Sequence, residues 1–341
     1  MPKKLLSGNE AFAWGFRDHG GHFASAYPGT PSSEILETLG GFKEDLYAEW
    51  APNEKAAVEA AFGASLAGAR ALAAMKHVGL NVAADPLFVI AYTGVNGGLV
   101  IITADDPSMH SSQNEQDNRN YAPFAKVPLL EPSEPQEAYD FVGLGLELSE
   151  RYDVPVLIRS TTRLSHGKAI VNTLPERQRV PRKEIDLRWN KYVMMPLNAK
   201  RRRVDLAERL RKLKEFAERT EINKIEWGDK RVGIISSGPA YLYAKEAFPE
   251  ASFLKLGITF PFPEELVKRF AKEILDAGGE IYVVEELDPF LELRVKALGI
   301  PCKGKELLPE IGELTPETVS YTHLRAHETE ADLVCRLLLE K

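Results

Sequence analysis

Apolar and polar positions follow a repeating order along the first half of the chain. Short runs that are apolar on both faces predict buried parallel strands, and the amphipathic or small-residue stretches between them predict helices. One such pair is a helix from Asn53 and a strand at 71–75, which we expect to end in a glycine turn at Gly79. The expected strands of this half lie at 22–27, 45–50, 71–75, 99–104, 127–130 and 154–160. This alternation predicts an α/β fold with a doubly wound parallel sheet.

The same pattern divides the chain into four parts. Residues 1–166 carry the order just described, and residues 231–319 carry a shorter version of it. Residues 167–230 between them are charged and include one expected helix, from about 204 to 220, so we interpret them as a linker. Residues 320–341 form a separate tail. We therefore expect two α/β domains joined by a charged linker.

Two residue clusters in the linker and the tail have both a chemical and a structural interpretation. The basic run 200–203 could bind phosphate or nucleic acid, but acids alternate with the bases beyond it, which favours the solvated face of a linker helix. His323 and His327 have the spacing of a metal pair on a helix, but no third ligand is evident nearby. We therefore expect neither cluster to be a binding site.

Composition and charge exclude several classes of protein. Of the 341 residues, 44% are hydrophobic and 27% are charged, as in an ordinary globular protein. The net charge of -7 argues against nucleic-acid binding. The N-terminus is unlike a signal peptide and the apolar runs are shorter than a membrane span, so we expect a cytoplasmic protein with no membrane contact. The two cysteines form no C-x-x-C motif, and we expect no iron–sulfur cluster ligated by this chain alone.

The helix expected from Asn53 has a distinctive surface. Asn53 is a good N-cap, and Glu54 falls in the first turn, where the helix dipole favours a carboxylate. Behind Glu54, small residues recur at three- and four-residue spacing, so a backbone or a flat ligand must lie close to this face. These small residues are Ala57, Ala60, Ala61, Gly63, Ala64, Ala67 and Gly68. Taken alone, Glu54 is better explained as a solvated carboxylate in the first turn of a helix, because acidic first turns are common.

Several motifs together carry a family resemblance. They are YPGTPSSEI at 27–35, NEKAAVEAAFGAS at 53–65, MKHVGLNVAADPL at 75–87, ADDPSMHSSQNEQDNR at 104–119 and TTRLSHG at 161–167. With them the chain resembles the α subunits of indolepyruvate:ferredoxin oxidoreductases, which are thiamine diphosphate-dependent 2-oxoacid:ferredoxin oxidoreductases. The resemblance covers residues 4–319 and implies a pyrimidine-binding domain followed by a smaller transketolase C-terminal-like domain. It does not reach 320–341, which we expect to be non-native.

The resemblance also implies an activity and its requirements. Such enzymes oxidatively decarboxylate arylpyruvates such as indolepyruvate to aryl-acetyl-CoA, using coenzyme A and reducing ferredoxin. They pair the α subunit with a β subunit, and they hold thiamine diphosphate with Mg²⁺ and 4Fe-4S clusters. The sequence has no GDG-type diphosphate motif and no cluster domain, so we expect a truncated α subunit, inactive alone. Alternatives are the same chemistry on pyruvate, and a non-catalytic flavodoxin-like assembly module.

The resemblance assigns roles to residues that also have structural interpretations. Glu54 is implied as the catalytic carboxyl that shares a proton with the aminopyrimidine ring. Thr30, as N-cap of a helix with Pro31 in its first turn, is implied to bind the substrate carboxylate, and Arg119 to clamp it. The alternatives are an ordinary N-cap for Thr30, a surface position for Arg119 and a core position for His77. The implied cofactor-binding residues are Pro28, Gly29, Glu54, His77 and Gly79.

Asp105 and Asp106 invite a magnesium interpretation, because carboxylates are ligands that Mg²⁺ prefers. In the family that the chain resembles, the metal is bound with the diphosphate by a separate motif. We therefore expect the pair to cap the turn that follows the strand at 99–104 instead. We predict no metal ligands in this chain.

Overall fold

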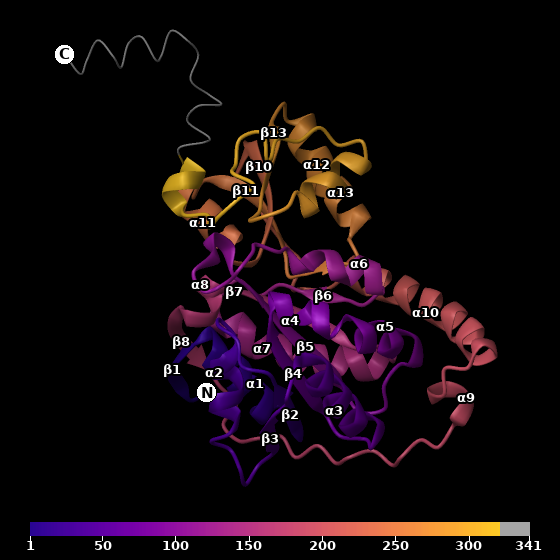
Figure 1. Ribbon diagram of the computed structural model, residues 1–341. Helices are drawn as coiled ribbons and strands as arrows, with labels where there is room; N and C mark the ends of the chain where they lie inside the picture. Colours follow the sequence, from indigo (N-terminus) through magenta and orange to yellow (C-terminus); the bar gives the residue numbers. More distant parts are fainter. Residues whose placement is uncertain (321–341) are drawn as a thin grey trace, which may run out of the picture.

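A computed structural model describes residues 1–320, and its centre is a sheet of seven strands (Figure 1). The order is β12-β6-β7-β5-β4-β2-β3, and all neighbours are parallel except β12 with β6. The strands are β2 (Phe23–Ala26), β3 (Tyr47–Trp50), β4 (Ala71–Lys76), β5 (Leu99–Asp105), β6 (Leu129–Leu130), β7 (Val156–Thr161) and β12 (Ile258–Phe260). The predicted parallel α/β sheet is confirmed.

Helices cover both faces of this large sheet. One layer contains α1 (Gly8–Asp18), α2 (Ser33–Leu39) and α7 (Pro135–Tyr152). The other contains α3 (Glu54–Leu66), α4 (His77–Val82), α5 (Ala84–Thr93), α6 (Tyr121–Ala125) and α10 (Pro196–Ala217). On β4, Leu72 and Ala74 pack into the first layer, whereas Ala73 and Met75 pack into the second. A central strand therefore has to be apolar at every position.

A second, smaller sheet has the order β13-β10-β11-β9. The strands β10 (Asp229–Ser237), β11 (Ala251–Leu256) and β13 (Glu280–Val284) are parallel, and β9 (Lys224–Glu226) is antiparallel to β11. The helices of this half are α11 (Gly238–Ala247), which has Pro239 in its first turn, and α12 (Glu264–Asp276) and α13 (Phe290–Ala297), which begin directly after Pro263 and Pro289. The strand β12, from the second half of the chain, is an edge strand of the large sheet, which the sequence pattern did not predict.

The segment expected to be a free linker is bound to the first half of the chain. The Val180 carbonyl lies 2.9 Å from Nε2 of His22, and the Lys183 amide donates to the Gly68 carbonyl. The helix α10 begins at Pro196, eight positions before the expected start, and it buries Leu206 and Leu213 against the large sheet. The remaining elements are β1 (Lys3–Ser7), which pairs with β8 (Lys168–Asn172), and the short helices α8 (Thr162–His166), α9 (Trp189–Tyr192), η1 (Pro107–Met109) and η2 (Asn118–Asn120).

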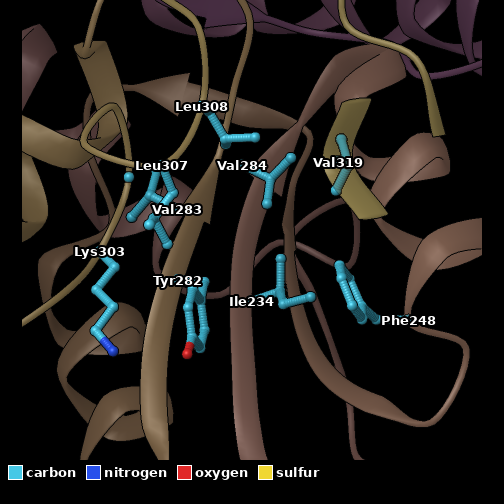
Figure 2. Close-up of a pocket in the computed structure, with 10 residues that line it drawn as sticks. Ile234, Phe248, Tyr282, Val283, Val284, Lys303, Leu307, Leu308 and Val319 are labelled. Carbon is cyan, nitrogen blue, oxygen red and sulfur yellow. The ribbon is translucent and has the colours of Figure 1, made fainter. Parts of the chain in front are cut away.

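A small cavity beside the second sheet shows how far the core extends along the chain. Figure 2 shows Ile234, Tyr282, Val284 and Val319 around it. Its volume of about 20 Å³ is room for one water, and its apolar lining makes it a packing gap. Val319 is buried there, so the core reaches at least to residue 319.

Two sequence predictions concern features that bear on partners and boundaries. Within residues 1–320, no helix is long and apolar enough to cross a membrane. The predicted non-native tail, including His323 and His327, lies outside the described residues except for Ser320.

Candidate functional site

Glu54 lies where the sequence predicts, at the start of α3. The Asn53 side chain accepts a hydrogen bond from the Ala56 amide at 2.9 Å, which confirms the predicted N-cap. Glu54 is 9% exposed, and within the described part of the chain its carboxyl has no hydrogen-bond or ion-pair partner. A carboxyl with so little exposed surface and no partner among residues 1–320 is available to a group that is not part of them.

Gly79 lies directly beside the Glu54 side chain. A Cβ atom at Gly79 would come within 2.6 Å of both Cγ and Oε1 of Glu54, so only glycine fits without moving the carboxyl. Gly79 is not in the turn that the sequence predicts, because α4 begins at His77, directly after Lys76 of β4. This early helix start places the α4 backbone against the start of α3.

The small-residue face of α3 is only partly covered by the chain itself. Ala57 and Ala61 pack into the core, whereas Ala60, Gly63 and Ala67 are exposed. A Cβ atom at Gly63 would meet nothing within 4 Å. Glu54 is thus not fully solvated, which argues against a non-catalytic assembly module. The exposed small residues lie on the side of α3 away from Glu54, because Ala57, Val58 and Ala61, which share its side, are buried.

The 28–32 segment follows β2 and lies at the same edge of the sheet as Glu54 and Gly79. Because β2 is parallel to both β3 and β4, the segments after these three strands meet at their carboxyl ends. Pro28 and Thr30 are exposed, and a Cβ atom at Gly29 would lie 3.0 Å from Cδ of Lys76. The structure therefore brings Pro28, Gly29, Thr30, Glu54 and Gly79 to one edge of the sheet.

The predicted capping role of Thr30 is wrong. The helix α2 begins at Ser33, with Ser32 as its N-cap and no side-chain capping bond. Before it, the Ser32 amide donates to the Gly29 carbonyl at 2.8 Å, and the Gly29 amide donates to Oγ of Ser33 at 2.8 Å. This extra turn delays the helix and leaves Thr30 exposed ahead of it.

His77 is fully buried beneath the 106–118 loop rather than in an open cavity. Its Nε2 lies 3.1 Å from the Asn114 carbonyl oxygen, so this nitrogen carries the hydrogen. Burial lowers the pKa of His77, which favours the neutral ring. These contacts favour the core interpretation, and a contact between His77 and a cofactor stays a prediction.

Arg119 has contacts that the sequence did not suggest. It is 1% exposed, so the surface alternative is wrong. Its guanidinium pairs with Asp117 and with Glu285 at 2.5 Å and 2.6 Å, and it donates to the Glu286 and Asp288 carbonyls. Arg119 thus joins the loop after β5 to the end of β13, and these bonds leave it no free edge to clamp a substrate.

A second buried arginine extends this connection across the large sheet. Arg159 on β7 donates to Asp105 at 2.6 Å and to Glu131 at 3.0 Å, and Glu131 accepts from Thr259 beside it. Burial raises the pKa of Asp105 to about 7, although Arg159 opposes the shift. The sequence signal was an arginine directly after the apolar run 156–158, and its partners were too distant along the chain to be recognised.

Asp105 and Asp106 have different roles. Asp106 accepts hydrogen bonds from the Ser111 amide and from Thr162, both at 2.8 Å, so it caps the loop as predicted. Asp105 belongs to the buried charge network instead. Among residues 1–320, no group of three or more metal-ligating side chains is arranged to hold a metal.

An open hollow of about 530 Å³ lies at the carboxyl ends of β2, β5 and β7. Thr30 lines it, together with His110, Arg163, His166 and Glu313. Arg163 pairs with Glu313 through two hydrogen bonds, one of them 2.9 Å from Nη2 to Oε2. The guanidinium that shares an open space with Thr30 is therefore that of Arg163, which the sequence analysis did not single out.

Comparison with known proteins gives a consistent set of relatives. A model of the family described as pyruvate flavodoxin/ferredoxin oxidoreductase, thiamine diphosphate-binding, matches residues 17–212. The chain is 47% identical to indolepyruvate oxidoreductase subunit IorA of Archaeoglobus fulgidus, over 87% of this chain and 49% of the relative. It is 42% identical to the subunit of the same name from Pyrococcus horikoshii, over 92% of this chain and 51% of the relative. The chain thus spans about half the length of these curated relatives.

Solved structures match the fold. The 2-oxoglutarate:ferredoxin oxidoreductase of Magnetococcus marinus superposes with a TM-score of 0.74 at 16% identity, covering 95% of this chain and 65% of that one. A split-gene transketolase superposes with a TM-score of 0.55 at 15% identity, covering 95% and 98%. At these identities the likeness concerns the fold alone.

Proposed function

The chain belongs to the pyruvate flavodoxin/ferredoxin oxidoreductase, thiamine diphosphate-binding family, and from that premise we propose that it supplies the pyrimidine-binding half of a thiamine diphosphate site. The complete enzyme would oxidatively decarboxylate a 2-oxo acid, with ferredoxin as electron acceptor. Indolepyruvate is the proposed substrate, because the curated relatives at 42–47% identity carry that name. Pyruvate is the alternative substrate.

The unpartnered Glu54 carboxyl is the observation that carries this proposal. It is nearly buried and lies against the backbone of Gly79, on the side of α3 that also carries the small residues Ala57 and Ala61. These features fit a flat ring with a ring nitrogen toward Glu54, which would hold a proton at that nitrogen. When bound, thiamine diphosphate supplies the ring carbon that adds to the 2-oxo acid.

The hollow beside Thr30 is the proposed position of the substrate carboxylate. It adjoins the Pro28–Thr30 segment, and Arg163 offers a guanidinium fork that suits a carboxylate. Glu313 holds that fork in the described chain, so the substrate would replace one carboxylate partner by another. Arg119 is not part of this proposal, because its hydrogen bonds hold the two sheets together.

Other requirements of the proposed enzyme lie outside the described residues. We propose that Mg²⁺ and the diphosphate are held by a further domain, that 4Fe-4S clusters receive the electrons, and that a β subunit and coenzyme A complete the reaction. The relatives are about twice as long as the matched region, which leaves room for such parts in the complete protein.

The test is Glu54→Gln in the complete α subunit, assembled with its β subunit and assayed anaerobically for indolepyruvate-dependent ferredoxin reduction. Glutamine keeps a hydrogen-bonding side chain but cannot share a proton. We expect kcat to fall by roughly 10²–10⁴-fold, the usual contribution of a proton-transfer group, with little change in cofactor affinity.

The matched control is Glu59→Gln on the same helix. Its side chain is 55% exposed, and its contact to Lys55 is 3.9 Å long. We expect this variant to keep wild-type turnover. Near wild-type turnover of Glu54→Gln itself would remove Glu54 from the mechanism.

A further inference from the structure

A second open groove lies away from Glu54, between α10 and the second sheet. Its volume is about 500 Å³. Its walls come from the end of α6, from α10, from the segment after β12 and from α13. In Figure 1, α10 runs out on the right beside α6, below α12 and α13. A groove of this size accommodates a small organic ligand.

Positive charge dominates the lining of this groove, although the whole chain has a net charge of -7. Two of the cations already have carboxylate partners: Arg211 pairs with Glu208 and Glu215, and Lys214 pairs with Glu264 at 2.7 Å. Three others, Lys126, Arg203 and Arg294, have no carboxylate partner within residues 1–320. Unpaired cations from three different elements therefore face one space.

Arg294 shows that this surplus charge is not simply solvated. Its side chain is half-buried, its Nη1 donates to the Phe290 carbonyl at 2.6 Å, and its guanidinium lies 3.5 Å from the centre of the Phe290 ring. Burial and the nearby Arg119 lower the pKa of Arg294. A partly desolvated cation without an ion-pair partner is unfavourable, so an anion in the groove would stabilise it.

Lys126 is placed at the groove by an unusual backbone conformation. It follows α6 in the left-handed region, with φ of 63°, which is uncommon for a residue other than glycine. Its Nζ reaches only the Phe124 carbonyl, at 3.3 Å. The conformation therefore directs a lysine into the groove without satisfying its charge.

The groove also has an apolar side. Phe260 and Phe262 line it together with the side chains of Ala207 and Leu210 on α10. Phe260 is half-buried, so part of its ring faces the open space. An apolar wall beside unpaired cations suits a ligand that joins a planar group to an anion.

We propose that this groove binds a phosphorylated ligand with a planar apolar group, of the nucleoside diphosphate class. A phosphate offers several strong acceptor oxygens to cations that converge from three elements, whereas one carboxylate offers two. The phenylalanine wall receives the planar group. This site revises the sequence interpretation of the basic run 200–203: Arg202 pairs with Asp153, and Arg203 faces the groove.

The test uses the whole 341-residue chain, with ADP, pyrophosphate and adenosine as calorimetric probes at low and moderate salt. The same diphosphate occurs in free nucleotides and in nucleotide-bearing cofactors, so coenzyme A is a separate arm. We expect ADP or coenzyme A to bind more tightly than either pyrophosphate or adenosine, because only they engage both the cations and the apolar wall.

Arg203→Gln is the informative variant, because Arg203 is exposed and has no ion-pair partner whose loss would affect folding. We expect it to weaken nucleotide binding by about ten- to a hundredfold, the usual effect of one charge-assisted hydrogen bond. Arg201→Gln is the matched control, because Arg201 is also exposed on α10 but does not line the groove. It should leave binding unchanged.

Three results would overturn the proposal. The first is that neither ADP nor coenzyme A binds. The second is an equal loss in both variants, which would indicate unspecific attraction to a basic helix. The third is Arg203-dependent binding of polyglutamate or duplex DNA that ADP does not displace, which would assign the groove to a macromolecular partner.

Discussion

The carboxyl edge of the large sheet has two halves that are built differently. After β2, β3 and β4, the chain leaves an unpartnered carboxyl, glycine backbone and an exposed helix face. After β5, β6 and β7, Asp105, Arg159 and Glu131 form a buried ion network at the same edge, next to the second sheet, and the hollow lined by Thr30 and Arg163 lies at the border between the two halves. The open half has the features of a ligand site, whereas the closed half is a contact between two parts of the chain.

This difference separates two meanings of a buried charge. The strongly shifted pKa values of the closed half belong to groups that form ion pairs with one another, such as Asp105 with Arg159. Perturbed ionisation is often used to find functional sites, but structural ion networks perturb it as well. At this sheet edge, the better indicator is a nearly buried carboxyl without a partner.

The largest expected effect on stability comes from breaking the closed half. Arg119→Met would leave Asp117 and Glu285 buried without their cation, which should lower the free energy of unfolding by about 3–5 kcal/mol. Urea denaturation of the 341-residue chain measures this. Arg188→Met, which removes an exposed pair with Asp186, is the control and should cost about 1 kcal/mol or less. If Arg119 bound substrate instead, its variant would raise KM and leave stability unchanged.

The pH dependence of the free energy of unfolding tests the closed half without removing a side chain. The folded pKa of Asp105 is raised to about 7 from 3.8, so between these values the folded state holds a proton that the unfolded state has lost. Its contribution to stability therefore falls as pH rises through this window, by at most about 3 kcal/mol between pH 5 and 7. Asp105→Asn should flatten the measured slope. An unchanged slope in that variant would assign the titration to other groups, among them Glu285, whose pKa burial also raises.

In the open half, Gly79→Ala should act on turnover rather than on stability. The added methyl group would displace the Glu54 side chain, and we expect at least about a tenfold loss of kcat in the complete enzyme. The free energy of unfolding should change by less than about 1 kcal/mol, since alanine is the better helix former. Gly63→Ala, where a Cβ meets nothing in the chain, should not weaken folding. Wild-type turnover in Gly79→Ala would mean that the position of Glu54 does not matter.

The smallest expected effect is in cofactor binding: we expect no measurable heat of thiamine diphosphate binding to the isolated chain. The open half offers one carboxyl and an apolar face but no anchor for a diphosphate, so the isolated chain should bind thiamine diphosphate more weakly than about 1 mM. Calorimetry on the 341-residue chain measures this. A micromolar dissociation constant would show that this half alone is a complete cofactor site.

The open half could be predicted from sequence because its determinants are local. The N-cap at Asn53, the small-residue spacing of α3 and the apolar β4 lie within one continuous stretch, and each follows from short-range rules. Thr30 was misassigned because Ser32, two positions later, is an equally good cap. Nothing local distinguishes the two, and the turn from Gly29 to Ser33 decided between them.

The closed half could not be predicted in this way. Arg119 and Glu285 are separated by 166 positions, and Glu131 and Thr259 by 128. Periodicity and turn chemistry carry no information about such pairs. An arginine in an apolar strand, as at Arg159, indicates a buried partner but does not identify it.

The strand β12 also sets an order of events during synthesis. It pairs with β6, so one border of the large sheet stays open until the ribosome has made residues 258–260. With 128 positions between Glu131 and Thr259, this interval lasts about 6–25 s at the usual rate of elongation. During that time the nascent chain carries an unpaired strand edge and Arg119, whose carboxylate partner Glu285 has not yet been made. The first half is thus the part most in need of protection from misassembly while the second half is being made.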